Sequence, residues 1–318
     1  MASKGKLRFC IVGCGNVALK YGIDAIINSG VSEVVVCVDH GIAKKKTVKE
    51  MFNLPFELKF SDALQNYDFD AVYLSTPTGL HKEIAFEASE NGKHILCEKS
   101  LASNFNDAKE MLKSAEKNDV ALFEGFMYQF HSQHAFVNRL LKDNKIGKVF
   151  QLNAWFGFPG RPNEDFRYNK LKGGGALLDA GAYTLHFARN FFGTEPEVVK
   201  SVLSGDIRVN LRGNILLSFA ENKTAQLSFA MNSFYKNKYE LWGEDGIIRV
   251  ERAFSVSLDY KPVVVLENKD GLEKFELEPD NHFKNEIKYF VQNYSNSSIR
   301  EEWSREAFAQ AELIEKVV

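Results

Sequence analysis

The chain has 318 residues, and its 40 lysines and arginines against 42 aspartates and glutamates give a formal charge of −2 at pH 7. This length accommodates two domains, and the balanced charge without a basic stripe argues against nucleic acid as a partner. No apolar run approaches the roughly 20 residues of a membrane-spanning helix, and the start MASKGKLRFC lacks a secretion signal, so we expect a soluble, cytoplasmic protein with no membrane partner.

β-Branched runs alternate with helical patterns from Leu7 to about Glu124. The predicted strands are LRFCIV (7–12), EVVVCVD (33–39), AVYLS (71–75) and KHILCE (93–98). The predicted helices start at Asn16, near Ile42, after Thr78 and after Asn104. Because parallel strands are joined by crossover helices, this alternation predicts a doubly wound α/β Rossmann domain over residues 1–124.

Longer alternating strands follow after about Gly147. They are VFQLNAWFGF (149–158), ILLSFAEN (215–222), TAQLSFAM (224–231), KYELWG (238–243) and GIIRVE (246–251). Asp245-Gly246, between the last two runs, is typical of a tight hairpin turn. The second part, residues 125–318, is therefore predicted to be an α+β domain with a large, mainly antiparallel open sheet.

Three helical patterns accompany these strands. One opens at the three glycines of residues 173–175, and two amphipathic helices near 281–294 and 301–317 close the chain. We expect that the closing helices can pack back on the first domain. The second domain is expected to bind the substrate and to mediate oligomerisation.

The four cysteines, Cys10, Cys14, Cys37 and Cys97, lie in or beside predicted strands. They form no Cys-x-x-Cys pair and show no zinc-ligand spacing, so we expect reduced, buried thiols. A pair of histidines at 131 and 134 lacks a third ligand at local spacing, and no metal site is predicted.

The loop GCGNVA (13–18) follows the first predicted strand and opens a helix, as in a G-x-G-x-x-A dinucleotide fingerprint. Gly13 allows the tight turn, Gly15 lets a pyrophosphate approach the backbone, and Ala18 keeps the helix close to the strand. The helix N-terminus, at Asn16 and Val17, offers unpaired N–H groups to the anion. In this position the loop predicts an NAD(P)-binding domain.

Asp39 ends the second predicted strand, about 20 residues beyond the fingerprint, where an acid accepts hydrogen bonds from the adenosine ribose. This favours NAD, although Asp39 can also be a plain helix cap. His40 and the lysines of 44–46 could instead meet the 2′-phosphate of NADP, or the lysines could form a solvated helix face. Both cofactors therefore remain open.

The third predicted strand is followed by Ser75, Thr76 and Pro77, with His81 in the next helix. These side chains are expected at the carboxyl edge of the sheet, where ligands bind in open α/β folds. Thr78 can at the same time cap that helix. We predict that this loop faces the cofactor.

The fourth predicted strand ends in Glu98 and Lys99, which the same argument places beside the nicotinamide. The segment STPTGLHKEIAFEASENGKHILCEKSLA (75–102), with GCGNVA before it and GGGALLDAGAY (173–183) after it, resembles the glucose–fructose oxidoreductase and inositol dehydrogenase (Gfo/Idh/MocA) family. The resemblance covers essentially the whole chain. It implies a two-domain nicotinamide enzyme.

Three segments are similar to one branch of that family, the sugar-nucleotide 3-ketoreductases, and this resemblance favours NADP as the cofactor. They are EGFMYQFHSQH (124–134), DFRYNKLKGGGALLDAGAY (165–183) and KYELWGEDGIIRVERAF (238–254). Dihydrodiol dehydrogenases and aldose oxidoreductases share much of the second segment. The chain departs from the family at Ser100, where a proline is usual, at Ser132, and at 255–257, where ketoreductases tend to carry prolines.

The resemblance implies that Lys99, Tyr183 and Asp179 are catalytic. Hydride transfer to a carbonyl requires a group that protonates the developing alkoxide. Tyr183 is the expected donor, because an ammonium such as that of Lys99 favours a phenolate; alternatively Lys99 donates and Tyr183 orients the sugar. Asp179 lies four residues before Tyr183, on the same helix face, and is expected to bind a sugar hydroxyl or to steady Lys99.

Further residues are expected to contact the substrate. Tyr128 and His131 are polar enough to reach it, or they pack in the core. Arg161 and Arg167, with Tyr168 in the same loop, could grip a diphosphate or form surface salt bridges.

These observations predict an NAD(P)-dependent oxidoreductase acting on a sugar or nucleotide-sugar substrate, most specifically on a nucleotide-linked 3-keto hexose. An aldose, polyol or trans-dihydrodiol dehydrogenase is the alternative on the same scaffold. A non-enzymatic dinucleotide-sensing protein is a third possibility, but sensing does not require Lys99, Asp179 and Tyr183. Because the strands after residue 147 are rich in Phe, Leu and Val, we also expect a homo-oligomer, a dimer or tetramer, formed through the C-terminal sheet.

Overall fold

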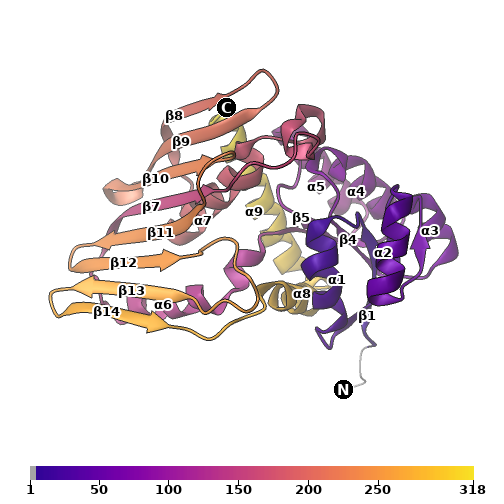
Figure 1. Cartoon of the computed structure of the whole chain (residues 1–318), viewed down its shortest axis with the longest axis horizontal. Coiled ribbons are helices and arrows are strands. Elements are labelled where there is room, and N and C mark those ends of the chain that lie inside the picture. Colours follow the sequence, from indigo (N-terminus) through magenta and orange to yellow (C-terminus); the bar gives the residue numbers. More distant parts are fainter. Residues whose placement is uncertain (1–4) are drawn as a thin grey trace. The chain divides into compact units, whose positions relative to one another are not determined.

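The computed structural model describes residues 5–318, so the first four residues of the N-terminal stretch lie outside it. The chain forms two compact units. Unit 1 comprises the residues up to Phe126 together with Phe283–Ala311, and unit 2 comprises Met127–His282 and Glu312–Val318. Each unit has its own sheet (Figure 1).

The sheet of unit 1 has six strands within the described residues, in the order β3-β2-β1-β4-β5-β6, and every neighbouring pair is parallel. The strands are β1 (Leu7–Val12), β2 (Ser32–Val38), β3 (Phe56–Glu57), β4 (Ala71–Leu74), β5 (His94–Glu98) and β6 (Leu122–Gly125). This is the doubly wound order, in which the chain reverses direction across the sheet between β1 and β4. Dinucleotides bind at that switch point, at the carboxyl ends of the strands.

All but one of the helices of unit 1 begin close to a predicted position. They are α1 (Ile23–Ile27), α2 (Ile42–Phe52), α3 (Phe60–Asn66), α4 (His81–Glu90), α5 (Phe105–Lys117), α8 (His282–Asn293) and most of α9 (Ser297–Lys316). The first of them is preceded by a π-helical turn, Ala18–Gly22, in a helix that starts at Asn16. Asn104 caps α5 by accepting a hydrogen bond from the backbone nitrogen of Asp107 at 2.9 Å.

Aromatic side chains of α8 and α9 complete the core of unit 1. The ring of Phe290 lies 6.0 Å from Phe9 of β1, and the ring of Trp303 lies 4.7 Å from Phe123 of β6. Helix α9 begins four residues before the predicted start at 301, because the polar residues at its entrance mark no sharp boundary in the sequence. Two segments distant in sequence therefore build one core.

The sheet of unit 2 has eight strands within residues 127–318, in the order β14-β13-β12-β11-β7-β10-β9-β8. The strands are β7 (Val149–Gly157), β8 (Glu197–Gly205), β9 (Asn210–Phe219), β10 (Lys223–Ala230), β11 (Lys236–Gly243), β12 (Gly246–Glu251), β13 (Val263–Asn268) and β14 (Gly271–Glu276). All pairs are antiparallel except β7 with β10. The hairpin predicted at Asp245-Gly246 joins β11 to β12, and the predicted fold class is confirmed.

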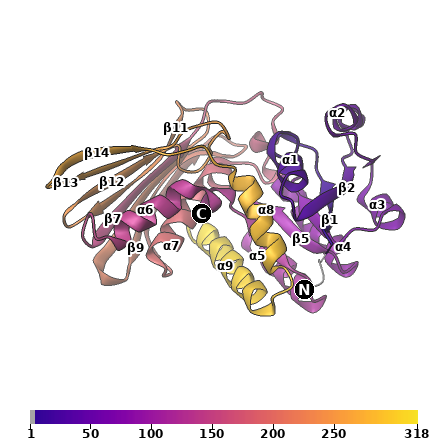
Figure 2. The ribbon, with the colours of Figure 1, turned by 90° about the horizontal axis from the view of Figure 1, so that it is seen from below.

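Two helices cover one face of this sheet, α6 (Ser132–Lys142) and α7 (Ala182–Phe192) (Figure 2). The helix containing α7 begins with a π-helical turn, Leu177–Gly181. Along β7 the residues Leu152, Ala154 and Phe156 are buried. Their neighbours along the strand alternate to the other, more polar face, because successive side chains of a strand point to opposite sides.

No helix among residues 5–318 is long and apolar enough to cross a membrane. The cysteines are buried and free, as predicted: Cys10, Cys14, Cys37 and Cys97. Strands β3, β6, β8, β13 and β14 and helices α3 and α6 were not predicted. Most of these are short or lie at sheet edges, where the hydrophobic alternation is weak.

Candidate active site

The loop after β1 is built around Gly13. Gly13 has a φ of 96°, and a Cβ at this position would lie 2.6 Å from the backbone nitrogen of Thr76. Ser75 Oγ donates to the carbonyl oxygen of Gly13 at 2.7 Å. Because glycine alone tolerates this backbone and this contact, the loop after β1 lies directly against the loop after β4.

Three observations fit a dinucleotide at this edge of the sheet. A Cβ on Gly15 would meet only the carbonyl oxygen of Ser75, at 3.9 Å, so a ligand has room to approach the backbone. The next residues, Asn16 and Val17, begin the helix, whose first N–H groups have no partner within it. Thr76 Oγ1 is buried without a hydrogen-bond partner among residues 5–318, and a bound group would supply one.

Asp39 follows β2 and is held by backbone N–H groups on both sides. Its Oδ2 accepts from the nitrogen of Cys14 and its Oδ1 from the nitrogen of Gly41, each at 2.8 Å. The side chain is 13% exposed, while that of the neighbouring His40 is 94% exposed. Since a carboxylate has about four lone-pair positions, Asp39 can still accept from two hydroxyl groups.

His81 joins two loops at this edge of the sheet. Its Nε2 lies 2.9 Å from the carbonyl oxygen of Thr76, and its Nδ1 lies 3.1 Å from the carbonyl oxygens of both Ser100 and Leu101. The ring is buried, and burial lowers the pKa of His81. These contacts favour a role in positioning the loops that contain Thr76 and Pro77 and the residues after Lys99.

Glu98 ends β5 and Lys99 follows it, and the peptide bond from Lys99 to Ser100 is cis. Glu98 is buried, and Tyr73 Oη donates to its Oε1 at 2.5 Å. Burial raises the pKa of Glu98. Glu286 of α8 is also buried, and both burial and the charge of Glu98 raise its pKa.

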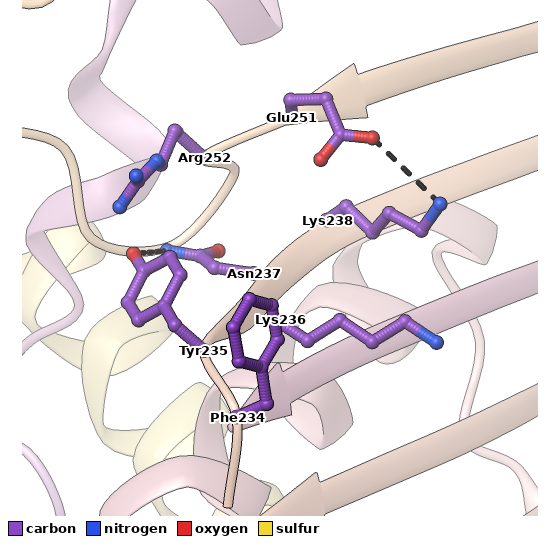
Figure 3. Close-up of a pocket in the computed structure, with 7 residues that line it drawn as sticks. All are labelled: Phe234, Tyr235, Lys236, Asn237, Lys238, Glu251 and Arg252. Carbon is purple, nitrogen blue, oxygen red and sulfur yellow. Dashed lines mark hydrogen bonds and ion pairs between the residues drawn. The ribbon is translucent and has the colours of Figure 1, made fainter. Parts of the chain in front are cut away.

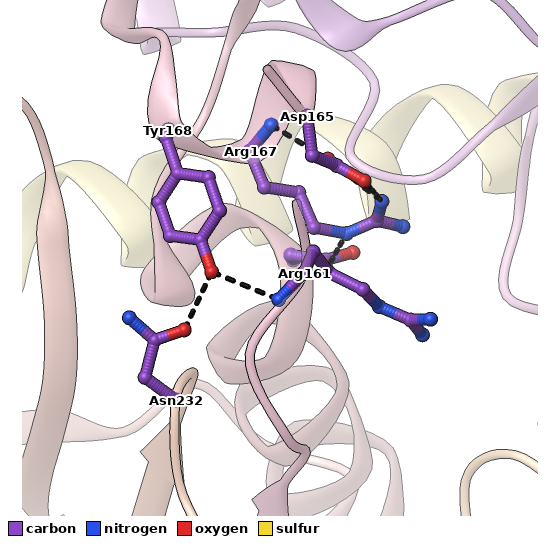
Figure 4. A network of polar contacts seen from close by, with 6 residues as sticks. Arg161, Asp165, Arg167, Tyr168 and Asn232 are labelled. Atoms are coloured by element: carbon purple, nitrogen blue, oxygen red, sulfur yellow. Dashed lines mark hydrogen bonds and ion pairs between the residues drawn. The ribbon is translucent and has the colours of Figure 1, made fainter. Parts of the chain in front are cut away.

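The polar centre of unit 2 is Arg167, which contacts two carboxylates (Figure 4). Its Nε donates to Asp179 Oδ2 at 2.5 Å and its Nη1 to Asp165 Oδ1 at 3.1 Å. The side chains are about one-fifth exposed, at 22% for Arg167 and 17% for Asp179. Burial alone would lower the pKa of Arg167, but the two carboxylates raise it. Arg167 therefore stays positively charged, and the carboxylates balance its charge.

The three glycines of residues 173–175 make this pairing possible. A Cβ on Gly174 would lie 2.5 Å from the carbonyl oxygen of Arg167. The nitrogen of Gly175 donates to the same carbonyl oxygen at 2.9 Å. The glycines therefore bring the backbone of Arg167 against the start of the helix that contains Asp179.

Tyr183 lies one turn further along this helix, in α7, and is 5% exposed. Its Oη donates to the sulfur of Met127 at 3.3 Å. The ring contacts those of Phe156 at 5.3 Å and Tyr128 at 5.9 Å. The phenol group is therefore held at the inner face of the sheet of unit 2.

Tyr128 and His131 are buried in unit 2. Tyr128 Oη is hydrogen-bonded to His186 Nδ1 at 2.8 Å. His131 Nδ1 accepts from the nitrogen of Gln133 at the start of α6, and burial lowers the pKa of His131. These contacts favour a supporting role for both residues over direct contact with substrate.

The loop that contains Arg161 is tied to the connection between β10 and β11. Tyr168 Oη donates to Asn232 Oδ1 at 2.5 Å and accepts from the nitrogen of Arg161 at 3.0 Å. The guanidinium of Arg161 is exposed and lies 5.8 Å above the ring of Phe158. Of the two predicted diphosphate ligands, Arg161 is accessible and Arg167 is already ion-paired.

Four residues of these networks were not predicted: Tyr73, Asp165, Asn232 and Glu286. Asp165 stands two residues before Arg167, and an acid near a predicted helix entrance is a usable signal. Glu286 and Asn232 come from segments far from their partners in the sequence, and no local pattern marks them. Within the described residues, no group of three or more His, Cys, Asp or Glu side chains is arranged to hold a metal ion.

Comparison with known proteins agrees with this geometry. A family described as "Oxidoreductase family, NAD-binding Rossmann fold" matches residues 7–126, and the "GFO/IDH/MocA C-terminal domain" matches residues 134–249. A dTDP-3,4-didehydro-2,6-dideoxy-alpha-D-glucose 3-reductase from Actinomadura kijaniata is 33% identical over 99% of this chain and 96% of its own length.

The fold of a 3-ketoreductase from the same organism, solved in complex with NADP and TDP-benzene, is also similar. Its structure matches with a TM-score of 0.92 and 33% identity, covering 98% of this chain and 97% of that one. A trans-1,2-dihydrobenzene-1,2-diol dehydrogenase from Xenopus laevis is 29% identical over 69% of this chain and 67% of its own. These matches exclude the non-enzymatic alternative. The chain belongs to the Gfo/Idh/MocA family of NAD(P)-dependent oxidoreductases.

Proposed function

We propose that this protein is a 3-ketoreductase that reduces the keto group of a nucleotide-linked deoxyhexose. The observation that carries the proposal is the helix entrance of unit 2, where Arg167 holds the carboxylate of Asp179 one turn before the phenol of Tyr183. A sugar with several hydroxyl groups needs such an oriented acceptor beside a proton donor. Similarity to dTDP-sugar 3-reductases over nearly the whole chain supports the same substrate class.

The reduced nicotinamide, when bound, supplies hydride to the carbonyl carbon. Tyr183 donates its hydroxyl proton to the oxygen that becomes negative, and the ammonium of Lys99 stabilises the resulting phenolate. Asp179 accepts a hydrogen bond from a neighbouring sugar hydroxyl. Arg167 orients Asp179 through their ion pair.

For the cofactor, we propose NAD(H) in preference to NADP(H). The support is Asp39, whose carboxylate is fixed by the N–H groups of Cys14 and Gly41 and keeps acceptor positions for two ribose hydroxyls. A 2′-phosphate at the same place would meet a like charge. The residues that would hold the rest of the dinucleotide are Gly13, Gly15, Asn16, Val17, Ser75, Thr76, Pro77, Glu98 and Lys99.

We also propose a homo-oligomer that forms through the outer face of the sheet of unit 2, and a cytoplasmic location. The support for the oligomer is an aromatic pair on that face, Phe150 and Trp242, whose rings lie 5.0 Å apart. Their exposed fractions are 38% and 46%. Large exposed aromatic side chains of this kind are typical of protein interfaces.

The test of the proposed reaction is turnover of a dTDP-3-keto-deoxyhexose, followed by loss of the reduced-nicotinamide absorbance. Tyr183→Phe is expected to lower kcat by about 10²–10⁴-fold, which is the usual contribution of a general acid, while affinity for the nucleotide is retained. Tyr67→Phe, in unit 1, is the matched control and should leave kcat unchanged. Undiminished turnover by Tyr183→Phe would exclude it as the donor, and efficient oxidation of free aldoses or dihydrodiols instead would favour the alternative class.

A further inference from the structure

A groove opens on unit 2 where β11 begins and β12 ends. Figure 3 shows the rings of Phe234 and Tyr235 beside each other, with Arg252 next to Tyr235 and the stems of Lys236 and Lys238 along the strand. Only Lys238, Glu251 and Arg252 of the groove belong to the segment 238–254 that resembles the ketoreductases, and none of its side chains has a part in the mechanism above.

The groove carries an excess of positive charge. Its cations are Lys236, Lys238 and Arg252, and its single anion is Glu251, which lies 3.7 Å from Lys238. Within the described part of the chain, no carboxylate lies within 4.0 Å of the charged groups of Lys236 or Arg252. Partial burial and the charge of Lys238 lower the pKa of Lys236, against the opposing effect of the Glu251 carboxylate. A bound anion would relieve this repulsion.

The groove also presents aromatic faces. Phe234 is 94% exposed, so its ring is accessible to a ligand. The guanidinium of Arg252 lies 4.3 Å above the ring of Tyr235 and 5.9 Å from the ring of Tyr260. Aromatic rings next to cations are the combination that binds nucleotides, because the rings stack on the base and the cations pair with the phosphates.

The walls of the groove are fixed in place. Asn237 is buried, donates from Nδ2 to Tyr235 Oη at 3.0 Å, and accepts at Oδ1 from the nitrogen of Phe254 at 2.8 Å. Arg252 has a left-handed backbone with a φ of 55°, which is uncommon for a residue other than glycine. Such conformations persist where surrounding structure holds them, and they are frequent at ligand sites.

The groove is connected to the network around Asp179. Asn232, two residues before Phe234, accepts from Tyr168 Oη at 2.5 Å. Tyr168 belongs to the same short helical turn as Arg167, which holds Asp179. The groove and the proposed sugar-binding carboxylate are thus built on adjoining loops of one unit.

We infer that this groove binds the nucleoside diphosphate part of the substrate, with the base on Phe234 and Tyr235 and the diphosphate on Arg252 and Lys236. The inference rests on the proposed function, because it assigns a subsite to a nucleotide-linked sugar. It differs from the assignment of the diphosphate to Arg161, which belongs to the neighbouring loop.

Isothermal titration of TDP into the full-length protein, with NADH present, tests the subsite without turnover. Arg252→Ala is expected to weaken TDP binding by about tenfold or more, since a charge-assisted hydrogen bond to phosphate is lost. Phe234→Ala should weaken it roughly tenfold through loss of base stacking. NADH affinity and the unfolding temperature should not change in either variant.

Arg249→Ala, on β12 three residues before Arg252, is the matched control. Arg249 is ion-paired with Glu240 at 2.8 Å and with Glu267 at 2.7 Å, so its removal should leave TDP affinity as in the wild type. Inorganic diphosphate serves as the probe for the anion alone and should bind more weakly than TDP.

Three results would overturn the subsite. If Arg252→Ala and Phe234→Ala both bind TDP like the wild type while Arg161→Ala does not, the diphosphate lies on the other loop and the proposed reaction survives. If inorganic diphosphate binds as tightly as TDP, the groove does not recognise the base. If the wild type binds no nucleoside diphosphate at all, both the subsite and the nucleotide-linked substrate are wrong.

Discussion

Arg167 donates from Nε to the carboxylate of Asp179, twelve residues later in the chain, at 2.5 Å. Arg167 also contacts Asp165, so its guanidinium is ion-paired with two carboxylates of unit 2. Arg167, which was predicted to bind phosphate, therefore holds the carboxylate of Asp179, which was predicted to bind the sugar. This relationship leads to the first prediction.

Arg167→Gln is expected to lower kcat about tenfold, because Asp179 loses the partner that orients it. The free energy of unfolding should fall by on the order of 1–3 kcal/mol, since a largely buried carboxylate loses its ion pair with Arg167. Steady-state kinetics and urea denaturation measure the two effects. Arg208→Gln, which removes an exposed ion pair with Asp206, is the control and should change neither.

A double variant tests whether Arg167 acts by positioning Asp179. If Arg167 acts through Asp179, the double variant Arg167→Gln/Asp179→Asn should be no slower than Asp179→Asn alone, because the effects of coupled residues are not additive. Fully additive losses in kcat would show that Arg167 acts independently of Asp179.

Asp39→Ser is expected to shift cofactor preference toward NADP(H). The substitution removes a negative charge from the place that the 2′-phosphate would occupy. The ratio of kcat/KM for NADPH to that for NADH should therefore rise about tenfold or more. This change corresponds to at least about 1.4 kcal/mol. Lys49→Ala, on the exposed side of α2, is the control and should leave the ratio close to that of the wild type. A wild-type enzyme that already prefers NADPH would contradict the assignment.

Glu286→Gln is expected to make stability less sensitive to pH. In the wild type, burial raises the pKa values of Glu286 and Glu98 in the folded state, so the folded protein binds more protons than the unfolded chain above about pH 4.5. Its stability therefore falls as the pH rises toward the folded-state pKa, by about 1.4 kcal/mol for each pKa unit. Glutamine keeps the shape and does not ionise.

Denaturation of the wild type and of Glu286→Gln between about pH 5 and about pH 8 measures this difference, which should grow in favour of the variant as the pH rises. Glu90→Gln, at the exposed end of α4, controls for loss of a surface charge. A difference that stays constant across this range would mean that Glu286 does not take up a proton on folding.

The protein is expected to be larger than a monomer by light scattering at micromolar concentration. Trp242→Lys should shift the mass toward that of one chain, because it places a charge within the proposed interface. A wild-type mass of one chain would contradict the oligomer.

The parts of the fold that local sequence patterns predicted were the buried strands and the turns that contain glycine. The runs that became β1, β2, β4 and β5 are apolar because both faces of a parallel sheet are covered. The loop at Gly13 was recognisable because its backbone excludes a side chain. Edge strands such as β3 and β14 were missed, because a strand with one partner does not need a strong hydrophobic pattern.

The sequence by itself determined the Rossmann domain, the cofactor loop and the family, since these depend on residue spacing within short segments. The tertiary structure alone decided which polar groups meet: Arg167 with Asp179, His81 with the carbonyls of Thr76 and Leu101, and Asn232 with Tyr168. The sequence shows the charge of a side chain, but it does not show which group that side chain contacts. Pairing is set by the close approach of loops, which a Cβ on Gly174 would prevent and which no local pattern records.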